Sequence, residues 1–322
     1  MDLLEQYLHD CAVRGRTLRT VQSYKSSVKD YLDSFPDPES VTKQDLVCYI
    51  EHLQKRGKKP SSIQRDFSAI SGLYEYMRFM DLCTNNPILQ VRSRYLDQSY
   101  EPERRFIPEL EDVRNLVRAI EDDQDDMIRE LAMICLLAKT ASRRGEYLEL
   151  KDCDIDLDRN EIYWSAKKKR RIRLGFIDDE LNAILEAYLE WRAPRAKTDY
   201  LWITDRGGRI HKDYTNEVLA HYATPLGLHD PAGPLHKRLT CHCLRGFATT
   251  QMQRTGMTEI DIMWLRGDSL KKKTWANNYV EFDPDIIKTS YTRSAPKLTR
   301  SFLPGSPYPS GSQVFGPESL PV

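Results

Sequence analysis

Four segments with apolar residues at helical spacing fill about the first 85 residues of the chain. Residues 20–35 carry their apolar positions on one helical face and follow Thr17, which suits an N-cap. The segment 42–57 opens with the spacing of a capping box and closes on a glycine, as helix ends often do. A further helix is expected after Pro60. The pattern predicts a small helical bundle over residues 1–87.

A second domain is predicted over residues 108–296. Residues 88–107 are polar and arginine-rich without a sustained period, so we expect a linker there. The apolar run LAMICLLAKTA predicts a buried helix, and DIDL, EIYWS and RIRLGFI alternate like short antiparallel strands around a KKK turn. The end of the chain, 297–322, is rich in Pro, Gly and Ser and is expected to be a disordered tail. The predicted fold class is α+β, mostly α.

Charge is balanced overall but unevenly distributed. Lys plus Arg and Asp plus Glu each number 48, so net charge says nothing about a polyanionic partner. Acidic runs at 121–126 and 152–158 are set against basic runs at 167–173 and 271–273. Such segregation is compatible with one positive face, as in nucleic-acid binding, and equally with solvated surface.

Cysteine usage and hydropathy indicate a cytoplasmic protein. The 7 cysteines are scattered singly apart from Cys241 and Cys243, which suits a reducing compartment. The N-terminus MDLLEQYLHD is acidic where a signal peptide needs basic residues, and no apolar run approaches the roughly 20 residues of a membrane span. We expect no membrane partner.

Several separated residues fit phosphodiester chemistry without a metal. Such chemistry needs arginines to stabilise charge, a nucleophile, and a proton donor for the leaving oxygen. The chain offers Arg143 in SRRGEYLEL, Lys167 in the KKK turn, His242 and Arg245 in HCLR, and Tyr279 in WANNYVEF.

In order and wording these segments resemble the tyrosine recombinase (phage integrase) family. The family's G-x-R-x-x-E-L-x-x-L segment is similar to residues 141–150, and its H-x-L-R box to residues 242–245. The first domain resembles the family's SAM-like core-binding domain, and the likeness runs from about residue 3 to about residue 293. R-R-G-E and L-R-G-D resemble archaeal members. The resemblance implies a DNA breaking-rejoining enzyme fold with a mixed α/β catalytic domain.

The resemblance also implies roles for individual residues. Tyr279 would attack the scissile phosphate and form a 3′-phosphotyrosyl link, while Arg143 and Arg245 hold the non-bridging oxygens. Glu146 would orient its neighbours by hydrogen bonding rather than touch DNA.

Two further roles would move protons. His242 would handle the proton of the tyrosine, and Lys167 would protonate the leaving 5′-oxygen. The KKK turn leaves Lys168 and Lys169 as alternatives to Lys167.

Asp268 departs from the family pattern. Many members have L-G-H or L-G-W before the tyrosine, whereas this chain has L-R-G-D, and the interval from 268 to 279 is about two residues longer. An ionised carboxylate cannot donate a hydrogen bond to phosphate. Asp268 is therefore protonated at the phosphate, or it orients an arginine, or another side chain such as Trp275 takes the role.

Structural alternatives stand beside these assignments. Cys241-His242-Cys243 could bind zinc, but residues alternating along an extended segment point to opposite faces and no CxxC completes the site, so packing is favoured for the cysteines. His242 alone would more often be a core histidine. Tyr291 is a second tyrosine candidate that a helix would bury. Arg143 could simply form a salt bridge with Glu146 or Glu149.

The leading hypothesis is a site-specific DNA recombinase or integrase that works without metal, ATP or a small-molecule cofactor. Family likeness implies double-stranded DNA as partner and self-association into dimers and tetramers, with the segment after Tyr279 docking on a neighbour. The alternatives are a DNA-binding protein that has lost strand cleavage, a type IB topoisomerase, and a zinc-dependent interaction module.

Overall fold

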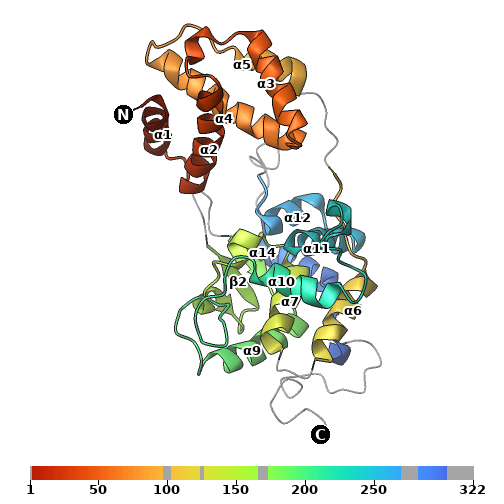
Figure 1. Cartoon of the computed structure of the whole chain (residues 1–322). Helices are drawn as coiled ribbons and strands as arrows, with labels where there is room; N and C mark the ends of the chain where they lie inside the picture. Colours follow the sequence, from red (N-terminus) through yellow and green to blue (C-terminus); the bar gives the residue numbers. More distant parts are fainter. Residues whose placement is uncertain (1, 97–102, 124–126, 166–172, 270–281, 303–322) are drawn as a thin grey trace. The chain divides into compact units, whose positions relative to one another are not determined.

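The chain folds into two compact units, residues 1–102 and 103–322. The computed structural model describes residues 2–96, 103–123, 127–165, 173–269 and 282–302 (Figure 1). Each unit has its own hydrophobic core.

The first unit is a bundle of helices, which confirms the predicted fold. Thr17 accepts a hydrogen bond from the N–H of Thr20, and Thr42 and Asp45 form the predicted capping box. Gly57 follows with a φ of +73°, in the left-handed conformation expected there. The elements are α1 (Leu3–Val13), α2 (Leu18–Ser34), η1 (Pro38–Ser40), α3 (Lys43–Lys55) and α4 (Pro60–Phe79).

The first unit extends beyond the predicted boundary at residue 87. A short helix α5 (Ile88–Val91) and the π-helical segment η2 (Arg92–Leu96) continue it. Ile88 and Val91 are buried in the core of this unit, which explains why the supposed linker is helical at its start. At the other end of that linker, Phe106 packs against the core of the second unit.

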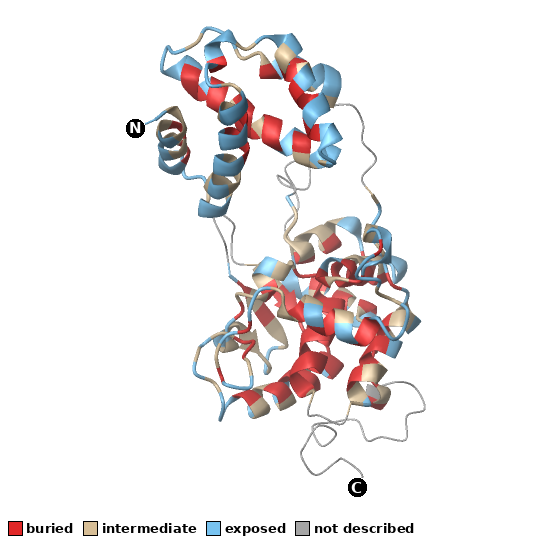
Figure 2. Ribbon diagram, viewed as in Figure 1, coloured by how far each residue is buried: buried red, intermediate tan, exposed pale blue. Residues whose placement is uncertain are grey.

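The second unit is built around the helix α7 (Ile128–Thr140), all of whose residues are buried (Figure 2). This confirms the predicted buried helix. It packs against helices α6, α9, α10 and α11. The helical elements around it are α6 (Leu110–Glu121), α8 (Arg144–Tyr147), η3 (Asp152–Asp154), α9 (Asp179–Arg192), α10 (Tyr214–Ala223), η4 (Leu235–Lys237), α11 (Cys241–Arg254), α12 (Glu259–Arg266), α14 (Pro284–Ser294) and η6 (Arg300–Phe302).

A small antiparallel sheet completes the second unit, also as predicted. Its strands are β1 (Ile155–Asp156), β2 (Glu161–Trp164) and β3 (Arg173–Phe176), in the order β1-β2-β3. Trp164 is paired with Arg173, and the Arg173 guanidinium lies 4.9 Å from the centre of the Trp164 ring. Helices α12 and α14 contact β3, so the sheet supports α12, which ends two residues before Asp268.

The segment after α14 is held by buried charges. Lys139 donates to the carbonyl of Pro296 (2.7 Å) and pairs with Glu180 (2.6 Å). The Glu180 carboxylate in turn accepts the N–H groups of Leu298 (2.9 Å) and Thr299 (2.6 Å). The sequence assigned residues 297–302 to the tail, but Glu180 fixes the backbone of Leu298 and Thr299, and Leu298 is buried in the core. Residues 303–322 lie outside the described part of the chain.

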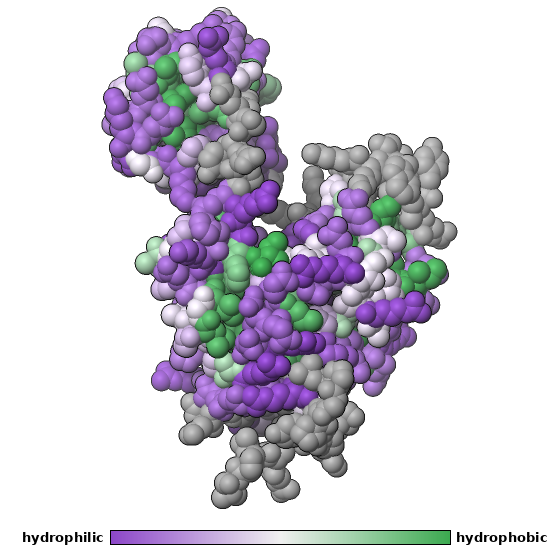
Figure 3. All heavy atoms as spheres, turned by 90° about the vertical axis from the view of Figure 1, so that its right-hand side faces the viewer, coloured by the Kyte–Doolittle hydropathy of each residue, from purple (hydrophilic) through white to green (hydrophobic). Residues whose placement is uncertain are grey.

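On the face of the second unit shown in Figure 3, hydrophilic side chains surround smaller hydrophobic patches. In the part of the chain that the structure describes, every helix is too short or too polar to cross a bilayer.

Replacing Glu121 with glutamine is expected to stabilise the second unit above pH 7. Burial raises the pKa of Glu121 to about 7, although the backbone and guanidinium of Arg300 lower it. In the unfolded chain the pKa of this carboxyl is about 4.5. The free energy of unfolding therefore falls as the pH rises from about 4.5 to about 7, and it stays at the lower value at higher pH. Glu121→Gln should remove a penalty of about 1–3 kcal/mol at pH 8 and have little effect at pH 4.

Denaturant unfolding of the full chain followed by tryptophan fluorescence measures this effect, because all 5 tryptophans lie in the second unit. Asp122→Asn is the matched control. The ion pair of Asp122 with Arg300 lowers the pKa of Asp122, so its amide should not stabilise at pH 8. Equal effects of the two substitutions at pH 8 would contradict the assignment.

Candidate functional site

Arg143 and Arg245 meet at one carboxylate oxygen. Arg143 Nη2 lies 2.5 Å from Asp268 Oδ1, and Arg245 Nη2 lies 3.2 Å from the same atom. Arg143 precedes α8, Arg245 lies on α11 and Asp268 follows α12, so three separate segments of the second unit build the contact. The structure thus brings together three of the residues singled out in the sequence.

Two left-handed residues place these arginines. Ala141 ends α7 with a φ of +50°, and its buried carbonyl accepts a hydrogen bond from Arg245 Nη1. Gly267 ends α12 with a φ of +61°, and its carbonyl accepts from Arg143 Nη2 (3.1 Å). The ends of α7 and α12 therefore supply fixed acceptors for the two guanidiniums.

Glu146 links Arg143 to a second arginine. Its Oε1 accepts from Arg143 Nη1 (3.0 Å) and its Oε2 from Arg173 Nη2 (2.8 Å). Burial raises the pKa of Glu146, but the charges of Arg173 and Arg143 outweigh it and hold that pKa below the ordinary value. Glu146 is therefore ionised and orients its neighbours, as the resemblance implies. The predicted pairing of Arg143 with Glu146 exists alongside its contact with Asp268.

Arg266 is a site residue that sequence reasoning missed. Its Nε lies 2.8 Å from Asp268 Oδ2, and its Nη1 donates to Thr249 Oγ1 (3.2 Å). Arg173 was likewise read only as a strand residue at the end of the basic run 167–173. A charged residue immediately before the helix-ending Gly267 was the available signal for Arg266.

The cluster carries excess positive charge. The guanidiniums of Arg143, Arg173, Arg245 and Arg266 face two carboxylates, Glu146 and Asp268, which leaves four minus two, or two, positive charges. Burial, followed by the charges of Arg266 and Arg143, lowers the pKa of Arg245 to about 10. The group still carries its proton at neutral pH. The cluster is therefore suited to bind an anion with preorganised donors.

His242 lies one helical turn before Arg245 and is exposed. Desolvation, together with the charges of Arg105, Arg245 and Arg144, lowers its pKa from the ordinary value of 6.5. The imidazole is thus neutral at pH 7, the form in which it can accept a proton.

Residues 241–243 are helical, not extended. They form the first turn of α11, so the argument that alternation places the cysteines and His242 on opposite faces was wrong in its geometry. The expectation that the cysteines pack is confirmed, because Cys241 and Cys243 are both buried in the core of the second unit. Among the described residues, three or more His, Cys, Asp or Glu side chains nowhere gather in a way that could hold a metal ion.

Lys167, with its alternatives Lys168 and Lys169, lies outside the described residues, as do Tyr279 and Trp275. The second tyrosine candidate, Tyr291, lies in α14 and is buried, which confirms the expectation for it. Ile287 and Tyr291 of α14 pack within their own unit against Phe176 and Leu265.

Replacing Gly267 with alanine is expected to destabilise the second unit by about 2 kcal/mol or more. The left-handed backbone disfavours any side chain there, and a Cβ would lie 2.8 Å from Cδ of Arg173. The control is Gly256→Ala, with a φ of +87° but nothing within 4 Å of its Cβ, so it measures backbone strain alone. Tryptophan fluorescence during denaturant unfolding compares the two. If both substitutions destabilise the second unit equally, the Arg173 side chain moves away from the new Cβ at no cost in free energy.

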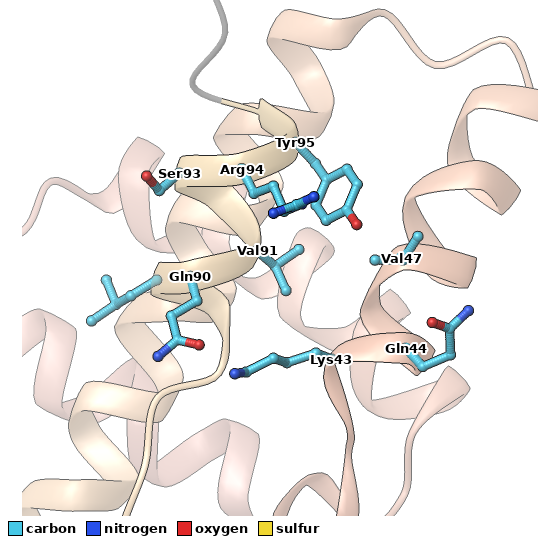
Figure 4. Close-up of a pocket in the computed structure, with 9 residues that line it drawn as sticks. Lys43, Gln44, Val47, Gln90, Val91, Ser93, Arg94 and Tyr95 are labelled. Atoms are coloured by element: carbon cyan, nitrogen blue, oxygen red, sulfur yellow. The ribbon is translucent and has the colours of Figure 1, made fainter.

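The first unit contains a separate groove of about 640 Å³ between the start of α3 and the segment α5–η2 (Figure 4). Lys43 extends from α3 toward Gln90, and Arg94 lies beside Tyr95 at the upper end. The groove is open and carries two basic side chains, so it suits an extended anionic partner better than a small apolar ligand.

Comparison with known proteins matches both units. The model of the phage integrase family matches residues 109–283, and the model of the phage integrase N-terminal SAM-like domain matches residues 3–81. Tyrosine recombinase XerD of Listeria innocua is 24% identical over 269 residues, or 79% of this chain and 86% of that protein. Tyrosine recombinase XerC of Herpetosiphon aurantiacus is 25% identical over 310 residues, or 92% of this chain and 95% of that protein.

Solved structures show the same fold. The Tn1549 transposon integrase in complex with a circular intermediate DNA has a TM-score of 0.69 at 18% identity, with 92% of this chain and 100% of that chain covered. A lambda integrase dimer bound to a COC′ core site has a TM-score of 0.66 at 17% identity, covering 87% and 78% of the two chains. These likenesses show the predicted α+β, mostly helical architecture.

Proposed function

The chain belongs to the phage integrase family, and we propose that it is a site-specific DNA recombinase that cuts and rejoins strands through a 3′-phosphotyrosyl link on Tyr279. The observation that carries the proposal is the convergence of Arg143 and Arg245 on one anionic oxygen. Two guanidiniums in this arrangement suit the non-bridging oxygens of a scissile phosphate, whose negative charge develops during transfer.

The proposed reaction exchanges one ester for another. The Tyr279 oxygen attacks phosphorus, the bond from phosphorus to the 5′-oxygen breaks, and a 3′-phosphotyrosyl link forms. His242 accepts the proton of the tyrosine, and its lowered pKa keeps the imidazole in the neutral form that this role requires. Lys167, or its neighbours Lys168 and Lys169, protonates the leaving 5′-oxygen. The link conserves the ester, so rejoining requires no ATP, and the arginines supply the charge that a metal would otherwise provide.

Double-stranded DNA is the proposed partner. The Tn1549 and lambda integrases of the solved structures are bound to DNA, and lambda integrase forms a dimer on a core site and a tetramer on a Holliday junction. We propose similar self-association for this chain. The groove of the first unit, with Lys43 and Arg94, is suited to contact the DNA backbone.

A second candidate is a DNA-binding protein that has lost strand cleavage. The observation favouring it is that Asp268, where many family members carry a donor, holds a carboxylate against both arginines. Covalent trapping on a nicked suicide substrate discriminates the two, because only a cleaving enzyme accumulates a protein–DNA adduct. Persistent absence of the adduct with DNA that the protein binds specifically would favour the second candidate.

A further inference from the structure

We infer that Asp268 is an internal competitor for the phosphate site: its carboxylate occupies the two arginines and must give way when a phosphate binds. The inference rests on the proposed function, because it takes Arg143 and Arg245 as the phosphate site. The proposed roles of the site residues include no group that competes with phosphate, and the inference adds one.

Every N–H group on the two Nη atoms of Arg143 has an acceptor. The two Nη atoms of a guanidinium carry four N–H groups. Nη1 donates to Glu146 Oε1 (3.0 Å) and to the carbonyl of Arg266 (2.9 Å). Nη2 donates to the carbonyl of Gly267 (3.1 Å) and to Asp268 Oδ1 (2.5 Å). The four contacts match the four N–H groups, so a phosphate oxygen can bind Nη2 only when one acceptor withdraws.

Asp268 is the acceptor best able to withdraw. The carbonyls of Arg266 and Gly267 belong to the end of α12 and are fixed with it. Glu146 is the more enclosed carboxylate, with 14% of its side chain exposed. Asp268 lies at the partly open side of the cluster, with 27% of its side chain exposed, and a side-chain rotation alone can remove it.

Arg245 contacts the same Asp268 oxygen as Arg143. Its Nη2 donates to Asp268 Oδ1 (3.2 Å), while its Nη1 is bound to the carbonyl of Ala141. One carboxylate oxygen thus contacts both guanidiniums, at the position where Arg143 and Arg245 would hold a non-bridging phosphate oxygen.

The displaced carboxylate can remain paired with Arg266. Its Nε is 2.8 Å from Asp268 Oδ2, the oxygen that does not contact the other arginines. The two excess positive charges of the cluster also accommodate a phosphodiester with one negative charge while Asp268 remains ionised. Displacement therefore needs neither protonation of Asp268 nor loss of its last partner.

Asp268→Asn tests the inference through the binding of inorganic phosphate to the full chain, measured by calorimetry at constant ionic strength. While Asp268 occupies Arg143 and Arg245, the apparent affinity for phosphate is reduced to the fraction of molecules in which the two arginines are free. We therefore expect the Asp268→Asn variant to bind phosphate about tenfold more tightly or better. Asp158→Asn is the control: it removes the same charge from an exposed residue that follows β1 and should leave the affinity unchanged. Asp268→Ala removes the acceptor altogether and should shift the affinity in the same direction.

Equal or weaker phosphate binding by folded Asp268→Asn and Asp268→Ala overturns the inference, because the carboxylate would then support the anion site. A matching gain in Asp158→Asn also overturns it, since net charge alone would explain the effect. The measurement needs neither Tyr279 nor DNA. If the Asp268 variants bind phosphate more tightly but the protein forms no adduct on DNA, Asp268 competes with phosphate as inferred, and the proposed strand cleavage is refuted.

Discussion

Tyr279→Phe should abolish the covalent adduct on a nicked suicide substrate while DNA binding stays unchanged. The substitution removes only the oxygen that would attack phosphorus, and phenylalanine retains the ring. Loss of a catalytic nucleophile lowers rates by about 10⁴-fold or more, which brings adduct formation to background. A denaturing gel with labelled DNA measures the adduct, and a mobility shift on the same DNA measures binding.

The matched control is Tyr291→Phe, which makes the same chemical change on α14. Tyr291 is buried, and within the described part of the chain its hydroxyl has no hydrogen-bond partner, so its removal breaks no hydrogen bond. This variant should form adduct at the rate of the unchanged protein. Adduct retained by Tyr279→Phe and lost by Tyr291→Phe would move the nucleophile to Tyr291 and refute the assignment.

Local signals made the helices of the first unit predictable. The cap at Thr17, the capping box at Thr42 and the left-handed Gly57 each depend on residues within one turn of a helix end. The boundary at residue 87 was less accurate. The helix Ile88–Val91 has only 4 residues, too few to show a period, and it is helical because the core of the unit buries it.

The site was predictable as far as its motifs extend. Arg143, Arg245 and Asp268 were each singled out, and their convergence is seen in the structure. The roles of Lys167 and Tyr279 stay predictions.

Long-range contacts were beyond the motifs. Arg173 was missed because its partner is far away in the sequence: it pairs with Glu146, 27 residues earlier. Arg266 pairs with Asp268 only two residues later, but the site to which both belong is built from separate segments of the chain. For Asp268 the sequence left three possibilities, and the structure shows it in contact with arginines.

Arg245→Lys should slow adduct formation by about 100- to 1,000-fold, the usual effect of losing one preorganised donor to a transition state. Lysine keeps the positive charge but loses the planar fork, in which one nitrogen of Arg245 binds the Ala141 carbonyl while the other is directed to the anion site. Since backbone phosphates supply most of the affinity and the charge is retained, DNA binding should change little. Single-turnover cleavage with excess protein separates the rate from binding.

Arg254→Lys on the same helix is the control for Arg245→Lys. Arg254 is exposed and pairs with Glu109 (2.6 Å), an interaction that a lysine can replace at the surface. Its cleavage rate should stay within about twofold of the unchanged protein, because surface ion pairs contribute little. If Arg245→Lys cleaves within tenfold of the unchanged rate, Arg245 is not a donor to the transition state. Its contacts with the Ala141 carbonyl and Asp268 would then be structural alone.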